Sequence, residues 1–506
     1  MTVSDLTHSS IDPVSPKINW ARIDEADNFA ETVKLYRQGK YDEDSFRRFR
    51  LQHGAYGTRM TSDYAMVRVK LPAGEIYPKQ FEKLSQLSEQ YSIGSAHFST
   101  RENIQLHWVI LEDVSEIFRS LAEVGLTSRE ACGNSVRNVM CSPLSGVCSD
   151  EKFDSTPYAL ATAKFFLRNP MAQSLPRKFK FNFTCCEKHG MVRMVDVGLI
   201  PEIQNIDGSE QKGFKIFLGG GLGNKSFVGH QLEDFTPEED LLYTSIAVMR
   251  IFDRLGDRKN LARNRMRYLV NDMGWEKFQN LVFKERAIVR ATQSVVTRLK
   301  VDTTPNTIKR PLKISDETGG SAPDGYARWL KTNTVKQKQS DYRSVFITLE
   351  AGDITSNQLN ALADLTREFS SEGIARSGFV QNVALRYVHE DDLISLYSKL
   401  LQFGLAKSGA LTMTTPIGCS GTTSCNLALT NSHRLAKEIQ RKFLELHLDE
   451  DDDLTDSSIK ISGCPNSCGQ HGIATIGFFG GGGRLGKDMY ANYQMSLGGR
   501  FDGETM

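Results

Sequence analysis

The chain has 506 residues, of which 40% are hydrophobic and 24% charged, the composition of a large globular protein with about three or four domains. Its formal net charge of +1 gives no reason to expect nucleic acid or an anionic membrane as a partner. No apolar run approaches the roughly 20 residues that span a bilayer, and the polar N-terminal segment lacks the order of a signal peptide, so we expect a cytoplasmic protein.

A long internal repeat organises the chain. The first copy begins at Leu71 with LPAGEIYPKQFEKLSQLSEQYS, and the second begins at Leu349 with LEAGDITSNQLNALADLTREFS. Each copy continues into a segment of strand character, which is ENIQLHWV from Glu102 in the first and QNVALRYV from Gln381 in the second. A short helical pattern then leads to a Gly-Leu pair in both copies. Each copy is therefore predicted to form a strand, a helix, a strand and a helix, and the repeat indicates a duplication rather than a solenoid.

The segment between the two copies has two parts. Residues 131–295 combine glycine-rich and basic motifs with helical stretches such as EEDLLYTSIAVMRIFDRLG, and residues 300–342 are interpreted as an extended connector. A later glycine run, FFGGGGRLG from Phe478, matches the dinucleotide-binding pattern G-x-G-x-x-G. No amphipathic helix follows this run, so we predict no flavin or NADPH domain and expect instead that the backbone approaches a bound group closely.

The most specific motif is a set of four cysteines near the C-terminus. Cys419 and Cys425 have five residues between them in GCSGTTSC, and Cys464 and Cys468 have three between them in SGCPNSCG. Four thiolates are the ligands that a 4Fe–4S cluster requires, because soft sulfur ligands match iron. Structural zinc sites favour more closely spaced pairs and ferredoxin clusters use runs of C-x₂-C, so a zinc site or unrelated core thiols are the weaker alternatives.

The other cysteines are harder to interpret. The total of nine is odd, and its uneven distribution favours metal binding in a reducing compartment over a disulfide framework. Four of them are interpreted as buried core thiols, namely Cys141, Cys148, Cys185 and Cys186.

The quartet resembles that of the sirohaem-dependent sulfite and nitrite reductases. In that family a C-x₅-C and C-x₃-C pair of motifs holds a 4Fe–4S cluster, and the last cysteine also ligates the iron of sirohaem. The resemblance implies that Cys419, Cys425, Cys464 and Cys468 bind the cluster. It further implies that Cys468 bridges the cluster and the sirohaem.

The same resemblance implies an α+β fold, a pseudo-twofold duplicated reductase fold with mixed sheets flanked by helices. We expect six segments, which are an N-terminal extension (1–49), a first ferredoxin-like half-repeat (50–130), a sirohaem and substrate domain (131–295), a connector (296–342), a second half-repeat (343–410) and a 4Fe–4S/sirohaem domain (411–506). The chain ends at GGRFDGETM, earlier than is usual in the family, so the last segment is expected to be C-terminally short.

Basic residues are expected around the cofactor. Sirohaem carries eight carboxylates and sulfite is a small dianion, so a protein that buries them must supply fixed cations, preferably arginines. By the resemblance, the side chains around the substrate anion are Arg68, Arg137, Lys178 and Lys180. The expected clamps on sirohaem carboxylates are Arg59, Arg101, Arg177, Arg265 and Arg267. For any one of them the alternative is an ordinary solvated surface residue. Glu102 stands where the family usually has glutamine, which is expected to weaken carboxylate binding nearby.

The resemblance implies reduction of sulfite to sulfide by six electrons, delivered by ferredoxin or a flavoprotein. Reduction of nitrite to ammonia by the same cofactors is the alternative. The R-K-F-K pattern with Lys178 and Lys180 is of the sulfite type, whereas nitrite reducers tend to carry asparagine at the position of Lys180. A more distant alternative is a non-catalytic iron–sulfur electron-transfer subunit, against which the scattered arginines argue, since a cluster alone needs no clamp for carboxylates.

Overall fold

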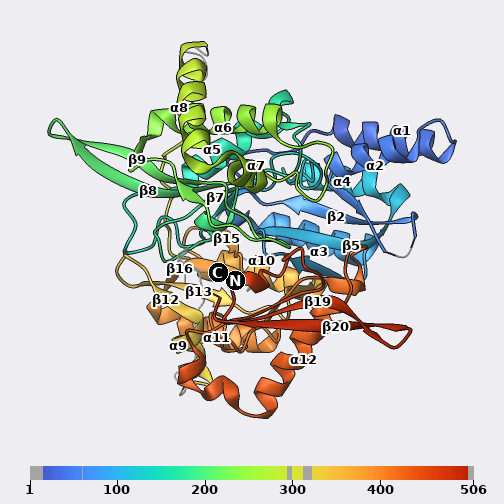
Figure 1. The fold of residues 1–506 in the computed structure, drawn as a ribbon. Coiled ribbons are helices and arrows are strands. Elements are labelled where there is room, and N and C mark those ends of the chain that lie inside the picture. Colours follow the sequence, from blue (N-terminus) through green and yellow to red (C-terminus); the bar gives the residue numbers. More distant parts are fainter. Residues whose placement is uncertain (1–14, 60, 293–298, 312–321, 500–506) are drawn as a thin grey trace, which may run out of the picture.

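The computed structural model describes residues 15–59, 61–292, 299–311 and 322–499, and in this part of the chain four sheets carry the helices (Figure 1). The helices are α1 (Asp24–Arg37), α2 (Glu43–Gln52), α3 (Pro78–Tyr91), α4 (Val114–Glu123), α5 (Thr156–Phe166), α6 (Leu241–Leu255), α7 (Met266–Met273), α8 (Trp275–Thr292), α9 (Tyr326–Asn333), α10 (Ser356–Phe369), α11 (Leu393–Gln402) and α12 (Ser432–Glu445). The helical pattern predicted around residue 245 is therefore confirmed as α6.

The first two sheets belong to the two copies of the repeat. Their strands are β1 (Ala55–Gly57), β2 (Tyr64–Lys70), β3 (Glu75–Ile76), β4 (Ser95–Phe98), β5 (Asn103–Ile110), β12 (Thr334–Lys336), β13 (Tyr342–Ile347), β14 (Asp353–Thr355), β15 (Ala375–Ser377) and β16 (Val383–His389). The first sheet has the order β1-β2-β5-β4-β14, and the second has the order β12-β13-β16-β15-β3. The predicted strand, helix, strand and helix of each copy are thus confirmed.

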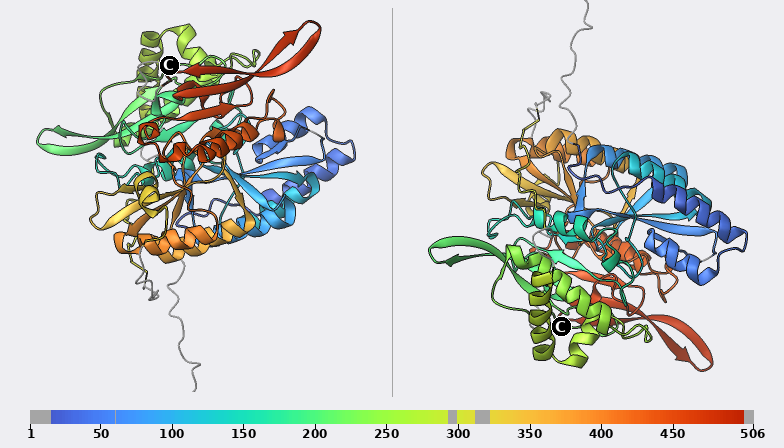
Figure 2. Two further views of the ribbon diagram at one scale, coloured as in Figure 1. Left: turned by 90° about the horizontal axis from the view of Figure 1, so that it is seen from below. Right: turned by 90° about the horizontal axis from the view of Figure 1, so that it is seen from above.

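The two copies exchange strands. β14 follows the core strand of the second copy but pairs antiparallel with β4 of the first, where Asp353 lies opposite His97. β3 of the first copy pairs in the same way with β15 of the second, where Glu75 lies opposite Arg376. The helices that follow these strands, α3 and α10, pack side by side, and Figure 2 shows the helices of both halves forming one layer. Both halves consequently share a single hydrophobic core.

The third and fourth sheets resemble each other in the directions of their strands. Their strands are β6 (Met140–Cys141), β7 (Phe181–Phe183), β8 (Val197–Ile206), β9 (Ser209–Leu218), β10 (His230–Gln231), β11 (Thr236–Pro237), β17 (Ile417–Gly418), β18 (Ile459–Ser462), β19 (Ile476–Leu485) and β20 (Asp488–Leu497). In the third sheet β6, β7 and β8 are parallel and β9 returns antiparallel, and in the fourth β17, β18 and β19 are parallel and β20 returns antiparallel. The long hairpins β8–β9 and β19–β20 extend outward on opposite sides of the molecule (Figure 1).

The glycine run from Phe478 lies inside β19, where Gly480 to Gly483 pair with β20. Because these glycines form a strand that pairs antiparallel with β20, they are not the strand-to-helix turn of a dinucleotide-binding loop. No helix in the described part of the chain is long and apolar enough to cross a membrane.

Candidate active site

A cavity of about 340 Å³ lies where the two halves and the C-terminal sheet meet. Its volume is in the range of small-molecule and cofactor sites. The lining comes from β2, β4 and β5 of the first half, from the loops beside β6 and β7, and from the loops that follow β17 and β18. Segments that lie far apart in sequence therefore meet around a single cavity between the duplicated parts of the chain.

All four predicted cluster ligands line one wall of this cavity. Cys419 and Cys425 follow β17, and Cys464 and Cys468 follow β18. Because β17 and β18 are parallel neighbours, the loops at their carboxyl ends meet. The wall is held by a backbone N–H of Gly463 that donates to Cys419 Sγ at 3.2 Å.

The cluster wall is also tied to both halves. Thr100 Oγ1 donates to the carbonyl oxygen of Cys468 at 2.9 Å. Gln381 donates from Nε2 to the carbonyl of Gly418 at 3.0 Å and accepts from the Gly418 N–H at 3.1 Å. These contacts fix the position of the cysteine loops relative to the opposite wall.

The rest of the cavity lining is strongly basic. The cations that line it are Arg68, Arg101, Arg137, Arg177, Lys178, Lys180 and Arg265, and no carboxylate is among the described lining residues. Burial lowers the pKa of Lys178 to about 7, and the charge of Arg265 adds to this effect. Burial also lowers the pKa of Lys180 well below its usual value, again with Arg265 as a further cause. A cavity with this lining favours an anionic occupant.

The structure brings together all four residues that the sequence assigned to the substrate anion. Arg137 is fixed by its own loop, since its guanidinium donates to the carbonyls of Gly133 and Ala131 at 2.8–3.1 Å. Burial lowers its pKa to about 10, which leaves it charged at neutral pH. Arg68 lies on β2, and its Nε atom is buried without a partner among the described residues.

Three of the predicted haem clamps, Arg101, Arg177 and Arg265, also line the cavity, and the other two do not. Arg59 donates from Nη1 to the carbonyl of Ala428 at 2.7 Å and so holds the loop after Cys425. Arg267 is buried behind the lining, with its guanidinium 4.8 Å from the ring centre of Tyr268. A clamping role for Arg59 and Arg267 remains a prediction.

Asp196 is a residue of the site that sequence analysis did not single out. It is completely buried and accepts from Arg265 Nη2 at 2.9 and 3.1 Å and from the backbone N–H of Lys180 at 3.0 Å. The carboxylate therefore orients the guanidinium of Arg265 and the backbone of Lys180, just before β7. No local pattern marks it, because its partners lie 16 and 69 residues away.

A second unpredicted group joins the two halves beside the cavity. Asp353 Oδ1 lies 3.0 Å from His97 Nδ1, and its Oδ2 lies 2.8 Å from His433 Nε2. His97 lines the cavity, whereas His433 belongs to α12, which follows the first cysteine pair. His433, which the sequence leaves without a role, is therefore part of the junction.

The residues present fit an iron–sulfur cluster next to a polycarboxylate group. Four cysteines on one wall supply thiolates for iron. In the same lining, Arg68 Nε and Arg101 Nη1 are buried donors that no described residue satisfies. Buried donors without partners are costly, so a bound anion is needed to complete the site.

Comparison with known proteins identifies the family. A family model described as "Nitrite and sulphite reductase 4Fe-4S domain" matches residues 132–290. A second, described as "Nitrite/Sulfite reductase ferredoxin-like half domain", matches residues 57–124 and again residues 335–403, which are the two copies of the repeat. The chain belongs to the nitrite and sulfite reductase family. The family implies sirohaem beside the 4Fe–4S cluster, in agreement with the basic cavity.

Some of the relatives are named sulfite reductases and others are named nitrite reductases. The chain is 27% identical over 429 residues to sulfite reductase (ferredoxin) 1 of Mycolicibacterium paratuberculosis, a match that covers 83% of this chain and 71% of that protein. It is 28% identical over 452 residues to the assimilatory ferredoxin-dependent nitrite reductase of Haloferax mediterranei, covering 86% of this chain and 74% of that protein. The structure of Mycobacterium tuberculosis NirA protein shares the fold, with a TM-score of 0.75, 23% identity and coverage of 94% of this chain and 87% of that chain.

Proposed function

We propose that this member of the family reduces sulfite to sulfide with six electrons. The observation that carries the proposal is the crowding of Lys178, Lys180 and Arg137 around one side of the cavity without a lining carboxylate among the described residues. A dianion balances more of this charge than the monoanion nitrite does. The two lysines are also the sulfite-type feature of the sequence.

Different residues of the chain are assigned to the two cofactors. We assign Cys419, Cys425, Cys464 and Cys468 to the cluster, and Cys468 also to the iron of sirohaem. When bound, these cofactors supply electrons one at a time to a substrate held on the sirohaem iron. Arg101, Arg177 and Arg265 are assigned to the carboxylates of the macrocycle. Asp196 keeps Arg265 in position for this role.

Arg68, Arg137, Lys178 and Lys180 are assigned to the substrate anion. Fixed cations in a water-poor cavity stabilise negative charge that develops on departing oxygens, because they need no reorganisation during the reaction. A lysine whose pKa is about 7 also exchanges protons readily at neutral pH. Lys178 is therefore the proposed proton donor for the oxygens that leave as water.

Nitrite is the second candidate substrate. A relative that is named a nitrite reductase is as similar to this chain as one that is named a sulfite reductase. The same cationic cavity attracts either anion. Because both relatives are named as ferredoxin enzymes, we propose ferredoxin as the electron donor.

The test is anaerobic turnover of the purified chain with reduced viologen, with sulfite and nitrite offered separately. We expect a higher kcat/KM for sulfite, measured as sulfide formed, than for nitrite, measured as ammonia. A clear preference for nitrite would overturn the substrate assignment and leave the cofactors in place. If the purified chain contains iron and the inorganic sulfide of a cluster but shows no tetrapyrrole absorption, the result would instead favour a non-catalytic electron-transfer subunit.

A further inference from the structure

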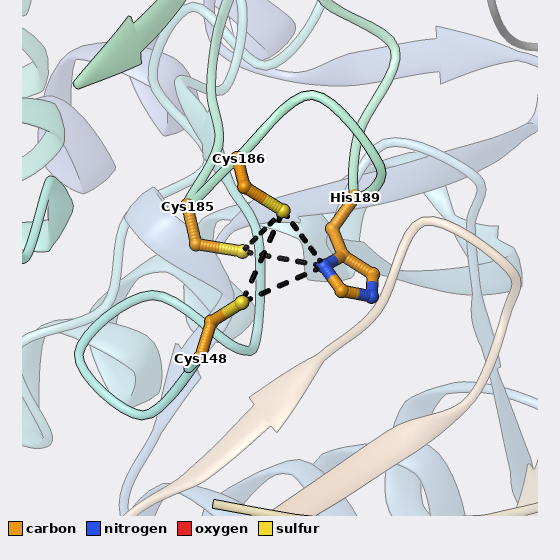
Figure 3. Close-up of side chains that lie close together, drawn as sticks. All are labelled: Cys148, Cys185, Cys186 and His189. Atoms are coloured by element: carbon orange, nitrogen blue, oxygen red, sulfur yellow. Dashed lines mark hydrogen bonds between the residues drawn. The ribbon is translucent and has the colours of Figure 1, made fainter. Parts of the chain in front are cut away.

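A second group of metal-binding side chains lies outside the cavity. Cys148, Cys185, Cys186 and His189 point toward one another (Figure 3), and their ligand atoms all lie within 4.8 Å of each other. The three cysteines are more than nine-tenths buried. The sequence predicts ordinary core thiols at these positions, whereas the structure places the three cysteines around a common centre with a histidine.

The separations match those of one tetrahedral metal ion. Zinc bonds of about 2.3 Å to sulfur and about 2.0 Å to nitrogen place tetrahedral ligands about 3.8 Å apart for two sulfurs and about 3.5 Å apart for sulfur and nitrogen. The Sγ atoms of Cys148 and Cys186 are 3.9 Å apart, and those of Cys185 and Cys186 are 4.0 Å apart. His189 Nδ1 lies 3.1–3.8 Å from the three sulfurs.

Two other readings of the group fit less well. A disulfide requires sulfurs about 2.05 Å apart, and all three cysteines are free. A 4Fe–4S cluster binds its thiolates to four different irons, so its ligands lie farther apart than the ligands of a single ion. Three cysteines and one histidine are instead a ligand set of closed, structural zinc sites.

The duplicated sheets give an independent reason to expect a metal here. The loop from β7 to β8 (residues 184–196) and the loop from β18 to β19 (residues 463–475) have the same length and connect parallel strands. Cys185 and Cys464 are the second residues of these loops, and His189 and Cys468 are the sixth. Counted from the ends of β6 and β17, Cys148 and Cys425 both stand seventh.

A matching hydrogen bond supports this alignment of the two sheets. The backbone N–H of Cys141, the last residue of β6, donates to Glu102 at 3.0 Å. The backbone N–H of Gly418, the last residue of β17, donates to Gln381 at 3.1 Å. Glu102 and Gln381 occupy the same position of the internal repeat. The position equivalent to Cys419 is Ser142, which lies 3.7 Å from Cys185 Sγ, and Cys186 replaces the missing sulfur.

We propose that Cys148, Cys185, Cys186 and His189 bind a structural Zn²⁺ ion at positions duplicated from the ligands of the iron–sulfur cluster. This assignment does not depend on the substrate of the enzyme. The ion joins the loop after β6 to the loop after β7, two strands whose other ends lead to Arg137 and Lys180. It thereby fixes the far ends of the two strands that directly follow these proposed substrate-binding cations.

The zinc loops also contact the second half of the molecule. Cys148, Cys185 and Cys186 belong to a small core cluster with Phe346 and Ala384. Beside them, the backbone N–H of Lys338 donates to the carbonyl of Val147 at 2.9 Å. Loss of the ion is therefore expected to loosen the contact between the third sheet and the second half.

The experiment measures zinc and iron in the full chain purified without added zinc, by elemental mass spectrometry after extensive dialysis. We expect about one zinc per chain, and zinc K-edge X-ray absorption of the same sample with three sulfurs at about 2.3 Å and one nitrogen at about 2.0 Å. Cys148→Ser and His189→Ala should each lower zinc at least tenfold while the iron content persists. Cys425→Ser should lower iron and keep zinc, and Cys141→Ser, a buried cysteine outside both groups, should keep both metals.

Several results would overturn the proposal. These are a wild-type chain without zinc, zinc bound only through oxygen and nitrogen, zinc that persists in the Cys148 and His189 variants, and loss of iron rather than zinc in Cys148→Ser. The absorption spectrum of the wild-type chain decides the question even if the variants do not fold.

Discussion

Lys178 and Lys180 are two residues apart in the segment just before β7, and both line a cavity that is also lined by arginines. Burial and neighbouring cations disfavour the charged form of a lysine, so both amines release their protons more easily than in water. An entering anion reverses this effect, because it stabilises the charged amine. In the proposed reaction, binding of the substrate is therefore coupled to uptake of protons that the reaction later consumes.

This coupling predicts a pH dependence. Lys178 is protonated below its pKa of about 7 and attracts the anion there, so kcat/KM should fall as the pH rises through about 7. Lys178→Arg keeps the positive charge to much higher pH and should shift the falling limb upward by at least one pH unit. The measurement is kcat/KM for sulfite between pH 6 and 9, with reduced viologen. Protonation of sulfite itself affects both proteins alike, so identical profiles would exclude Lys178 as the titrating group.

A second prediction distinguishes the substrates. Lys180→Asn removes one cation from the cavity and should reduce kcat/KM for sulfite about tenfold more than for nitrite, since the dianion loses more attraction. A tenfold difference corresponds to about 1.4 kcal/mol of transition-state stabilisation. Lys188→Asn, at an exposed lysine paired with Asp150, is the matched control and should leave both values unchanged. An equal loss for both substrates would exclude Lys180 as a determinant of specificity.

At the scale of elements, the repeat extends to unusual backbone conformations. Both copies place non-glycine residues at φ angles between 51° and 60°, namely Ala73, Glu102 and Trp108 in the first and Ala351, Gln381 and Tyr387 in the second. Such angles are uncommon for residues with a Cβ atom. The sequence predicts the helices and strands of each copy because their periodicity is local. It does not predict these φ angles, two of which fall inside strands β5 and β16, because none of the six residues is a glycine.

In the site too, short sequence motifs could be predicted, whereas contacts between residues far apart in sequence could not. The cysteine quartet and the basic motifs are short patterns, and the structure places all four cysteines and seven of the nine predicted cations around one cavity. Asp196, the carboxylate of Asp353 between two histidines, and the group around His189 were missed. Each of these depends on contacts between elements far apart in sequence, and an isolated Asp, His or Cys carries no signal of its partners.

Glu102 offers a test of the equivalence between the two copies. Its side chain accepts from the Cys141 N–H as Gln381 does from Gly418, but burial raises the pKa of Glu102 well above its usual value. The Glu102 carboxyl therefore stays protonated in the folded chain, whereas in the unfolded chain it ionises above a pH of about 4.3. Because the unfolded chain alone loses this proton, the free energy of unfolding decreases as the pH rises. Glu102→Gln removes this loss of stability and supplies a donor in place of the proton. It should raise stability at pH 8 by about 1 kcal/mol or more.

The measurement is thermal unfolding of wild type and Glu102→Gln at pH 5 and pH 8. The gain in the midpoint temperature should be larger at pH 8, because keeping the Glu102 carboxyl protonated lowers the stability of the wild-type chain at that pH. Gln381→Leu serves as a comparison, since it removes both hydrogen bonds to Gly418 and should destabilise at either pH. A gain from Glu102→Gln that is equal at both pH values would show that the carboxyl is ionised in the folded chain.

At the scale of the whole molecule, the strand exchange makes the two halves depend on each other. Each half-repeat sheet ends in a strand from the other copy, and α3 packs against α10 across the boundary. A half expressed alone lacks one edge strand and exposes the face that its partner helix covers. Unpaired edges and exposed apolar faces promote aggregation. The cavity is also divided along the chain, since all seven lining cations precede residue 312 and all four lining cysteines follow residue 321.

A chain broken between Pro311 and Pro323 should therefore assemble only when both fragments are made together. We expect the fragments to co-purify by a tag on one of them, to run as a single species in gel filtration, and to carry iron and tetrapyrrole absorption. Expressed separately, each should be insoluble or bind neither cofactor, because neither holds both walls of the site. A break between Asp207 and Gly208, at the tip of the β8–β9 hairpin, is the control for nicking alone, since its flanking strands belong to one sheet. A soluble monomeric half with a native thermal transition would show that strand exchange is dispensable for folding.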